Sequence, residues 1–361
     1  MEKIDVKIKA VKERTYPILI GENLLDDAYE FIRNVTDAGR FLIVTNNTVY
    51  SLYGDKMKDD DADFIIVPDG EEYKNREILN TIIDKALKMK LERKDAIIAL
   101  GGGVIGDMAG CAAAMYQRGI DFIQIPTTLL AQLDSSVGGK VAVNHKLGKN
   151  VIGFFYQPKL VLADTNTLNS LDDRQFKTGL AEAIKYAFIE KTCNAGEDFN
   201  LFEFFKKNRD EIYNKNHKIL KQLIKMCCIL KSSVVNQDEK EKGLRAILNF
   251  GHTYAHAIEI VTDYRYYTHG EAVSIGMKLI FDLAKEIGLI SDKYYNDSIS
   301  LINDYGLITK LGINPGKEIF YDAMLSDKKV KDKKIRFVMP VREKEVRFYN
   351  NIDKNMILRG I

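Results

Sequence analysis

Three of the chain's five histidines, His252, His256 and His269, lie within eighteen residues of one another. His252 and His256 are four residues apart, so on a helix they would share one face, and His269 opens the next helical pattern. Imidazole nitrogens that converge in this way are common ligands of zinc. Thr253 stands where the HExxH motif requires glutamate, so a zincin protease is disfavoured. A single histidine is usually a satisfied polar group, but this concentration favours a metal site.

A carboxylate would have to complete such a site, and Glu182 is the best candidate. Glu182 and Lys185 lie three residues apart in an otherwise apolar helical stretch. Charged side chains in such surroundings are costly unless they are paired or functional. We therefore expect Glu182 to join the histidines.

A glycine-rich segment at residues 101–106 follows an apolar run and opens a helical pattern. It fits the G-x-G-x-x-G fingerprint, in which bare backbone N–H groups approach a pyrophosphate at a helix N-terminus. The fingerprint normally lies in the first βα unit of a domain, so a tight turn is the alternative. Spacing alone leaves both interpretations open.

A second glycine cluster, at residues 134–140 and 148–150, places two lysines and an asparagine around glycine-permitted turns. This composition suits an anion. It is not a P-loop, because Val141 follows Lys140 and Asn150 follows Lys149 where that motif needs serine or threonine. A polar surface loop with solvated lysines is the alternative.

The elements that must position these residues change in kind near residue 165. Before it, short apolar runs alternate with helical patterns, which predicts parallel strands in βαβ units with ligands at their carboxyl ends. These runs are residues 41–44, 64–67, 96–100, 122–125 and 160–162, with a helical pattern at 78–87. After it, amphipathic stretches predict helices at 180–189, 219–235, 254–261 and 272–287, with one strand candidate at 335–339. We expect two domains, residues 1–165 and 166–361, packed closely around a cleft.

Composition limits the class of protein. Lys and Arg number 53 against 51 Asp and Glu, without a sustained basic run, which disfavours nucleic acid as a partner. The four cysteines, Cys111, Cys193, Cys227 and Cys228, include no CxxC pair and are interpreted as reduced thiols. Residues 1–14 alternate like a strand, unlike a signal peptide, and no apolar stretch is long enough for a membrane span. We expect a cytoplasmic protein without a membrane partner.

The ordered motifs of the chain resemble those of the 3-dehydroquinate synthase family, within the sugar-phosphate cyclases. The matching segments include residues 69–71, 101–107, 118–119, 124–140, 147–150, 179–186, 248–252, 269–273 and 327–329, together with Lys74. The resemblance implies an N-terminal Rossmann-like α/β domain that binds NAD, followed by a mainly α-helical domain that binds Zn²⁺ or Co²⁺. It also implies catalysis between the two domains and a homodimer.

The resemblance assigns site residues position by position. The metal ligands would be Glu182, His252 and His269, so that His256, unlike in the spacing argument, leaves the metal shell. NAD would be contacted by Asn46, Glu71, Lys74, Gly102, Gly103, Asp107, Thr127, Thr128 and Lys149. The catalytic and substrate residues would be Asp134, Lys140, Asn150, Lys185, Lys231, Arg245, Asn249, His256 and Lys328, with Arg118 reaching across a dimer interface.

The resemblance assigns different residues to the phosphate and to the carboxylate of the substrate. Lys140, Asn150, Asn249, His256 and Lys328 would hold the phosphate. The planar guanidinium of Arg245 would donate two parallel hydrogen bonds to the substrate carboxylate. Val141 and Ala255 depart from the family's usual threonine and glycine, and the loop at residues 264–268 looks unusual.

The implied reaction belongs to aromatic amino acid biosynthesis and converts 3-deoxy-D-arabino-heptulosonate 7-phosphate to 3-dehydroquinate and phosphate. It would proceed by transient NAD-mediated oxidation, β-elimination, reduction and intramolecular aldol closure. One alternative is a related cyclase acting on sedoheptulose 7-phosphate or glucose 6-phosphate. These sugars lack a carboxylate, and a buried Arg245 without an anion would be left unpaired, which favours the acid substrate. A polyol dehydrogenase and a non-catalytic phosphosugar-binding protein are further alternatives.

Overall fold

The computed structural model describes residues 15–326 and 335–361 of the chain. Its first half is built on a six-stranded parallel sheet with the strand order β1-β8-β5-β4-β2-β3. The strands are β1 (Ile18–Gly21), β2 (Phe41–Asn46), β3 (Ala62–Val67), β4 (Ala96–Gly101), β5 (Asp121–Pro126) and β8 (Leu160–Asp164). The five strands predicted from apolar runs are confirmed, whereas the short edge strand β1 was missed. The strand predicted within residues 1–14 lies outside the described residues.

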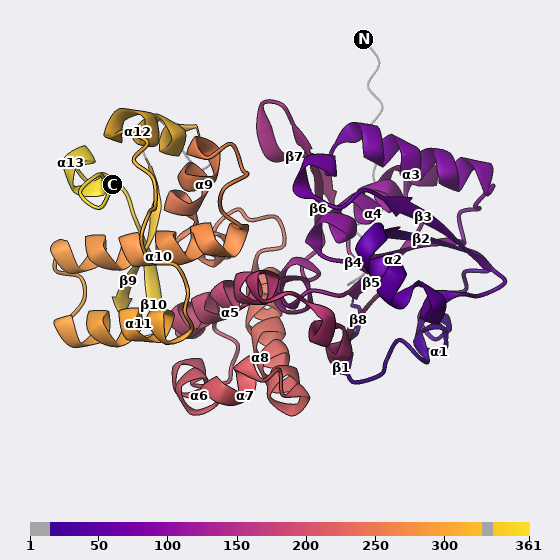
Figure 1. The fold of residues 1–361 in the computed structure, drawn as a ribbon, viewed down its shortest axis with the longest axis horizontal. Helices are drawn as coiled ribbons and strands as arrows, with labels where there is room; N and C mark the ends of the chain where they lie inside the picture. The colour runs from indigo at the N-terminus through magenta and orange to yellow at the C-terminus, as the bar shows by residue number, and fades with distance from the viewer. Residues whose placement is uncertain (1–14, 327–334) are drawn as a thin grey trace, which may run out of the picture.

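Helices cover both faces of this sheet (Figure 1). They are α1 (Ala28–Arg33), α2 (Asn47–Tyr53), α3 (Arg76–Lys88) and α4 (Gly103–Met115). Along β2, Leu42 and Val44 pack with α3 and α4, while Phe41 and Ile43 pack on the opposite face with residues of α1 and α2. Burial on both faces explains why the central strands are apolar without alternation.

The strand order reverses between β2 and β4. From β2 the chain continues to the edge strand β3, and from β4 it continues to β5 on the other side. In open parallel sheets such a reversal leaves a crevice at the carboxyl ends of the strands, where ligands bind. Asn46, Gly102 and Thr127 end or directly follow β2, β4 and β5, so they lie at this edge.

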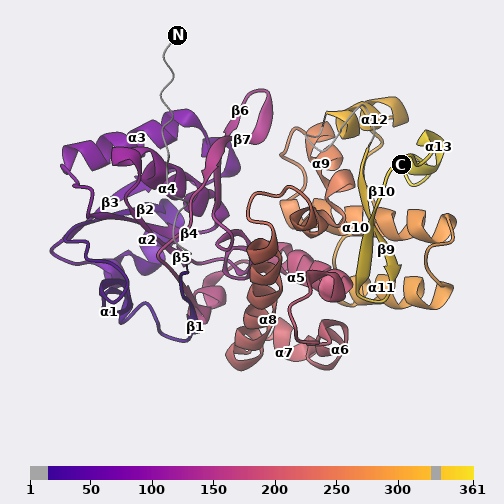
Figure 2. The same ribbon diagram turned by 180° about the vertical axis from the view of Figure 1, so that it is seen from behind.

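A two-stranded antiparallel hairpin, β6 (Lys140–His145) and β7 (Gly148–Phe155), stands beside the sheet on the side of α9 (Figure 2). The sequence predicted an anion-binding cluster around glycine-permitted turns here, with a polar surface loop as the alternative, and it did not predict these two strands. Val141 and Val143 are nevertheless buried against the α4 side of the sheet core. Gly110 on α4 leaves the space that the Val141 side chain fills.

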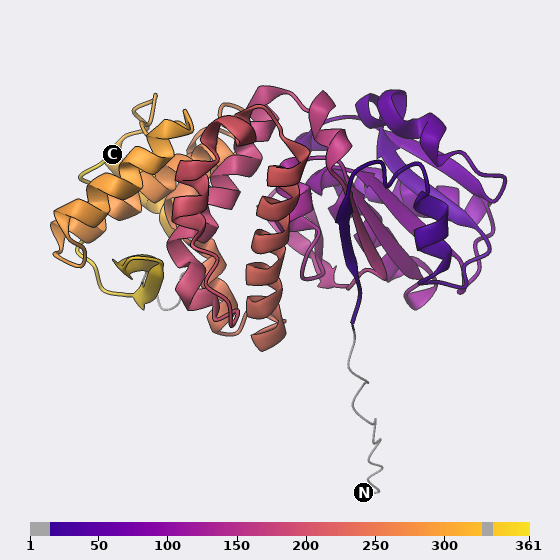
Figure 3. The ribbon, with the colours of Figure 1, turned by 90° about the horizontal axis from the view of Figure 1, so that it is seen from below.

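The second half is mainly helical (Figure 3). It contains α5 (Asp173–Cys193), α6 (Leu201–Lys207), α7 (Arg209–Tyr213), α8 (His217–Gln237), α9 (His252–Val261), α10 (His269–Glu286), α11 (Asp292–Asp304), α12 (Lys317–Leu325), β9 (Phe337–Arg342), β10 (Glu345–Tyr349) and α13 (Lys354–Ile357). Short turns of helix are η1 (Gly54–Met57), η2 (Glu71–Tyr73), η3 (Tyr116–Arg118), η4 (Ala131–Ser135), η5 (Thr165–Ser170) and η6 (Leu244–Asn249). The four predicted helices are confirmed, each starting two to seven residues before its apolar pattern.

The two halves share buried surface. Leu129, Leu133 and Val137, which precede the sheet's last strand in the chain, pack into the same core as the buried residues of α5. The segment around η4 is therefore held by the helical half, although the chain enters it from β5. None of the helices within the described residues is long and apolar enough to span a lipid bilayer.

Candidate active site

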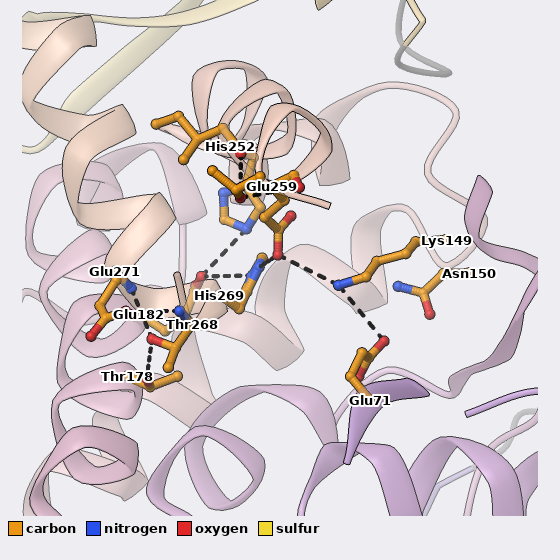
Figure 4. A network of polar contacts seen from close by, with 12 residues as sticks. Glu71, Lys149, Asn150, Thr178, Glu182, His252, Glu259, Thr268, His269 and Glu271 are labelled. Carbon is orange, nitrogen blue, oxygen red and sulfur yellow. Dashed lines mark hydrogen bonds and ion pairs between the residues drawn. The ribbon is translucent and has the colours of Figure 1, made fainter. Parts of the chain in front are cut away.

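Three side chains from three helices converge at one place in the helical half (Figure 4). Glu182 lies in α5, whereas His252 and His269 are the first residues of α9 and α10. Glu182 Oε1 is 3.3 Å from His252 Nε2 and 3.4 Å from His269 Nε2. Ligand atoms placed around a tetrahedral zinc would be about 3.3 Å apart. Donor types and spacing thus both fit a divalent metal.

Further contacts orient each of these ligands. His252 Nδ1 lies 3.0 Å from the Phe250 carbonyl oxygen, and His269 Nδ1 lies 3.2 Å from Glu259 Oε1. When Nδ1 donates to these oxygens, Nε2 of each ring keeps its lone pair for a metal. Lys185 Nζ is ion-paired with Glu182 Oε2 on the side away from the histidines.

Charge on the three ligands depends on these neighbours. Burial disfavours ionised Glu182, but Lys185 and His252 outweigh it and hold the carboxyl pKa well below its usual range. Burial lowers the pKa of His252 to about 4, so that ring is neutral near neutral pH. Burial acts in the same direction on His269, yet Glu259 and Glu182 raise its pKa to about 10. A metal binding here would therefore displace a proton from His269.

Glu259 is a candidate site residue that the sequence analysis did not identify. It is 5% exposed, and although burial would raise its pKa, His269 brings it down to about 2. Lys149 Nζ, on β7, lies 3.8 Å from Glu259 Oε1 and 3.9 Å from Glu71 Oε1. Figure 4 shows this path from the metal ligands to the α/β half. The available signal was the same as for Glu182: an acid within an apolar helical run.

Four of the residues predicted to contact NAD, Glu71, Lys74, Asp107 and Lys149, make polar contacts with one another or with the hairpin. Buried Lys74 is ion-paired with Asp107 and donates a 2.6 Å hydrogen bond to Asn150 Oδ1. Asn144, which the sequence analysis did not single out, donates to Glu71 Oε1 over 2.8 Å. The structure thus places Asn150, assigned to the phosphate by resemblance, in direct contact with a predicted cofactor residue.

The glycine segment adopts the strand-to-helix turn that the fingerprint predicts. Gly102 is the N-cap of α4, and a Cβ added there would lie 3.1 Å from Thr128 Cγ2. Thr127 N donates to Gly101 O over 3.0 Å, which keeps the ends of β4 and β5 together. The start of α4 therefore fits a pyrophosphate. Asn46 caps α2 by accepting a 2.9 Å hydrogen bond from Val49 N.

A second charged cluster surrounds Asp134. Lys231 Nζ lies 2.9 Å from Asp134 Oδ2, Tyr186 OH donates to Oδ1 over 2.5 Å, and Lys185 Nζ is 4.0 Å from Oδ1. Burial would raise the pKa of Asp134, but Lys231 and Lys185 lower it to about 2. Lys185 thereby joins this cluster to Glu182. Tyr186 was not singled out, because a tyrosine in an apolar helix carries no sequence signal of its own.

Arg245 is 2% exposed, and its guanidinium donates to main-chain oxygens of Gly138, over 3.0 Å, and Glu239. The expectation that a buried Arg245 would lack a partner without substrate is therefore wrong, because two carbonyls accept from it. Nearby, Glu241 is ion-paired with Lys140 Nζ and accepts a 2.8 Å hydrogen bond from Asn249 Nδ2. The sequence analysis did not identify Glu241.

Neither His256 nor Arg118 belongs to the group of described residues that could hold a metal. The His256 ring is perpendicular to that of His252, with centroids 5.6 Å apart. Arg118 is exposed in η3, and within the described part of the chain no hydrogen bond or ion pair joins it to another predicted site residue. Lys328 lies outside the described residues.

The unusual loop before His269 contributes to the site. Lys149 Nζ lies 4.1 Å from the centre of the Tyr264 ring, a cation–π arrangement. Thr268 forms a capping box with Glu271 at the start of α10 and accepts a 2.7 Å hydrogen bond from Thr178. The loop therefore both covers Lys149 and fixes the helix start that carries His269.

Comparison with known proteins gives consistent matches. Models described as 3-dehydroquinate synthase N-terminal and C-terminal match residues 64–178 and 179–330. A 3-dehydroquinate synthase of Thermoanaerobacter sp. is 45% identical over 93% of this chain and 97% of its own. A 2-epi-5-epi-valiolone synthase from Streptomyces hygroscopicus, solved with NAD⁺ and Zn²⁺, has a TM-score of 0.86 and 25% identity, covering 98% of this chain and 97% of its own. A 2-deoxy-scyllo-inosose synthase complexed with carbaglucose-6-phosphate, NAD⁺ and Co²⁺ has a TM-score of 0.82 and 28% identity, covering 96% of both chains.

Proposed function

The chain belongs to the 3-dehydroquinate synthase family, and from this premise we propose that it converts 3-deoxy-D-arabino-heptulosonate 7-phosphate to 3-dehydroquinate and phosphate. The observation that carries the proposal is the continuous path from Glu182 and His269 through Glu259 and Lys149 to Glu71. It joins a group fit for a metal to the sheet edge fit for a dinucleotide. A polyol dehydrogenase also needs these two sites, but it does not need the charged clusters beside them.

We infer that the cofactors are NAD and Zn²⁺ or Co²⁺, as in the two solved cyclases. NAD supplies a hydride acceptor and the metal supplies a Lewis acid that polarises hydroxyl and carbonyl groups. Glu182, His252 and His269 would hold the metal. The start of α4, with Lys74, Asp107 and the other residues assigned above, would hold NAD.

The two buried lysines of the Asp134 cluster are suited to different tasks. Burial opposes the charge of Lys185, but Glu182 and Asp134 keep its pKa raised, so it holds a fixed positive charge beside substrate oxygens. The pKa of Lys231 is lowered, first by burial, so its ammonium gives up a proton more easily. Lys231 is thus the better of the two for moving a proton during the reaction.

The remaining residues would position the substrate's anions. Lys140 and Asn249 both contact the carboxylate of Glu241, so they are close enough to bind one small anion together. We assign the phosphate to them, with Asn150, His256 and Lys328. Arg245 would use guanidinium hydrogens beyond its two carbonyl bonds for the substrate carboxylate.

The purified protein with NAD and Zn²⁺ tests this proposal. With the seven-carbon acid phosphate, we expect phosphate release together with a product of the mass of 3-dehydroquinate. Sedoheptulose 7-phosphate and glucose 6-phosphate serve as matched substrates without the carboxylate. Equal or faster cyclisation of either one would favour a related cyclase and contradict the acid substrate.

We also propose the division into domains at residues 1–165 and 166–361, a homodimer and a cytoplasmic location. The break at residue 165 is supported by the end of the parallel sheet at Asp164. Light scattering during size-exclusion chromatography would test the dimer, with an observed mass near that of one chain as the contradicting result. Fractionation of source cells would test the location.

A further inference from the structure

The phosphate assigned to Lys140 and Asn249 would compete with a carboxylate of the chain itself. Glu241 Oε2 is ion-paired with Lys140 Nζ, and Glu241 Oε1 accepts from Asn249 Nδ2 over 2.8 Å. The two donors come from β6 and η6, so Glu241 joins the α/β half to the helical half. Its carboxylate thus makes the two contacts that a phosphate oxygen pair would make.

The backbone presents Glu241 in a defined position. The residue has a φ of 54°, a left-handed conformation that is uncommon for a non-glycine residue. Asp238 closes the loop by accepting from Lys242 N over 2.8 Å, Gly243 N over 2.7 Å and Arg245 N over 3.0 Å. The side chain is 28% exposed, and it extends from an anchored turn.

We propose that Glu241 is a specificity-determining residue that occupies the phosphate position until the substrate's phosphate displaces it. The inference rests on the proposed function, since it takes Lys140 and Asn249 as phosphate ligands. Two anions cannot share one ammonium and one amide without strong repulsion, so Glu241 must leave when phosphate binds.

This displacement favours the complete substrate over simpler anions. The substrate can offset the cost through its carboxylate and hydroxyl contacts elsewhere in the site. Inorganic phosphate has no such contacts and meets the full competition from Glu241. After the reaction, the return of Glu241 to Lys140 and Asn249 would also favour release of the product phosphate.

The test is the dissociation constant of inorganic phosphate for the protein loaded with NAD and Zn²⁺, measured by equilibrium dialysis. Glu241→Gln keeps the size of the side chain and removes its charge. We expect this variant to bind inorganic phosphate about tenfold more tightly, which corresponds to about 1.4 kcal/mol. Phosphate should also inhibit its turnover at correspondingly lower concentration. Glu241→Ala should shift phosphate affinity in the same direction.

Glu239→Gln is the matched control in the same loop, because its carboxylate contacts Gln157 and its main-chain oxygen is retained. It should leave phosphate affinity unchanged, and an equal gain in this variant would overturn the proposal as a general charge effect. Lys140→Met distinguishes an error in the phosphate assignment from an error in the role of Glu241. If it does not weaken phosphate binding, the phosphate assignment itself is wrong, and the role of Glu241 with it. If it weakens binding but neither Glu241 variant strengthens it, only the role of Glu241 is wrong.

Discussion

Two regions of the site are built by different means: the three candidate metal ligands (the metal group) and the edge of the sheet proposed to bind NAD (the cofactor edge). Glu182, His252 and His269 are side chains on three packed helices, and each is oriented by a further contact. The cofactor edge instead combines the start of α4 with polar side chains that the exposed hairpin brings in. A metal requires ligand atoms at fixed distances, which a packed helical core can supply, whereas main-chain N–H groups suffice for a pyrophosphate. Substitutions in the metal group should therefore have larger effects than those at the cofactor edge.

The largest expected effect comes from a metal ligand. His252→Ala should abolish tight metal retention and lower kcat by at least about a thousandfold, because two ligands rarely hold zinc firmly. Metal content after dialysis and turnover provide the measurements. His256→Ala is the matched control on the same helix and should retain the metal. Equal metal loss in both variants would return His256 to the metal shell and contradict the assignment.

A smaller effect is expected from the residue that orients His269. Glu259→Gln removes the charge beside Nδ1 and should weaken metal affinity by about 10- to 100-fold, as measured by competition with a chelator. Glu286→Gln removes a carboxylate from the far end of α10, where Arg359 is its partner, and should leave metal affinity unchanged. Unchanged affinity in Glu259→Gln would mean that His269 is oriented by the helix alone.

Glycine substitutions compare the two regions directly. A Cβ at Gly270 would overlap the Thr178 carbonyl oxygen, so Gly270→Ala should displace the start of α10 and cost about 1–3 kcal/mol of unfolding free energy. At Gly102 the nearest atom would be 3.1 Å away, so Gly102→Ala should weaken NAD binding with little loss of stability. Urea unfolding and NAD titration measure both effects. Equal destabilisation by the two variants would remove the proposed difference between the regions.

The smallest effect concerns pH. The pKa of Asp134 is lowered from 3.8 to about 2, so its ionised form stabilises the fold above pH 3.8. This contribution, about 2 to 3 kcal/mol, is lost as the pH falls from about 4 through 2. Asp134→Asn should be less stable at neutral pH and should show a shallower decline in unfolding free energy over that range. An unchanged decline would exclude Asp134 as a source of acid sensitivity.

Most of the architecture could be predicted from the sequence, because the central strands and the long helices carry strong apolar patterns. The hairpin could not, since its two buried valines lie among residues that include exposed apolar ones, such as Leu147 and Phe154, and no regular apolar alternation marks its strands. The burial of Val141 depends on the space that Gly110 leaves on α4. Resemblance identified Glu182, His252 and His269, whereas spacing alone also included His256. Glu259 carried the same signal as Glu182, an acid in an apolar helical run, but the sequence did not pair it with His269. Glu241 carried no such signal, and only the tertiary structure brings Lys140 to it.

The consumption of NAD tests the central claim most directly. The acid phosphate and 3-dehydroquinate differ only by the elements of phosphoric acid, so the proposed conversion involves no net oxidation. With NAD at a small fraction of the substrate concentration, the protein should complete many turnovers, and absorbance at 340 nm should show no accumulation of NADH. Formation of one NADH for each product molecule would contradict the account and identify a dehydrogenase.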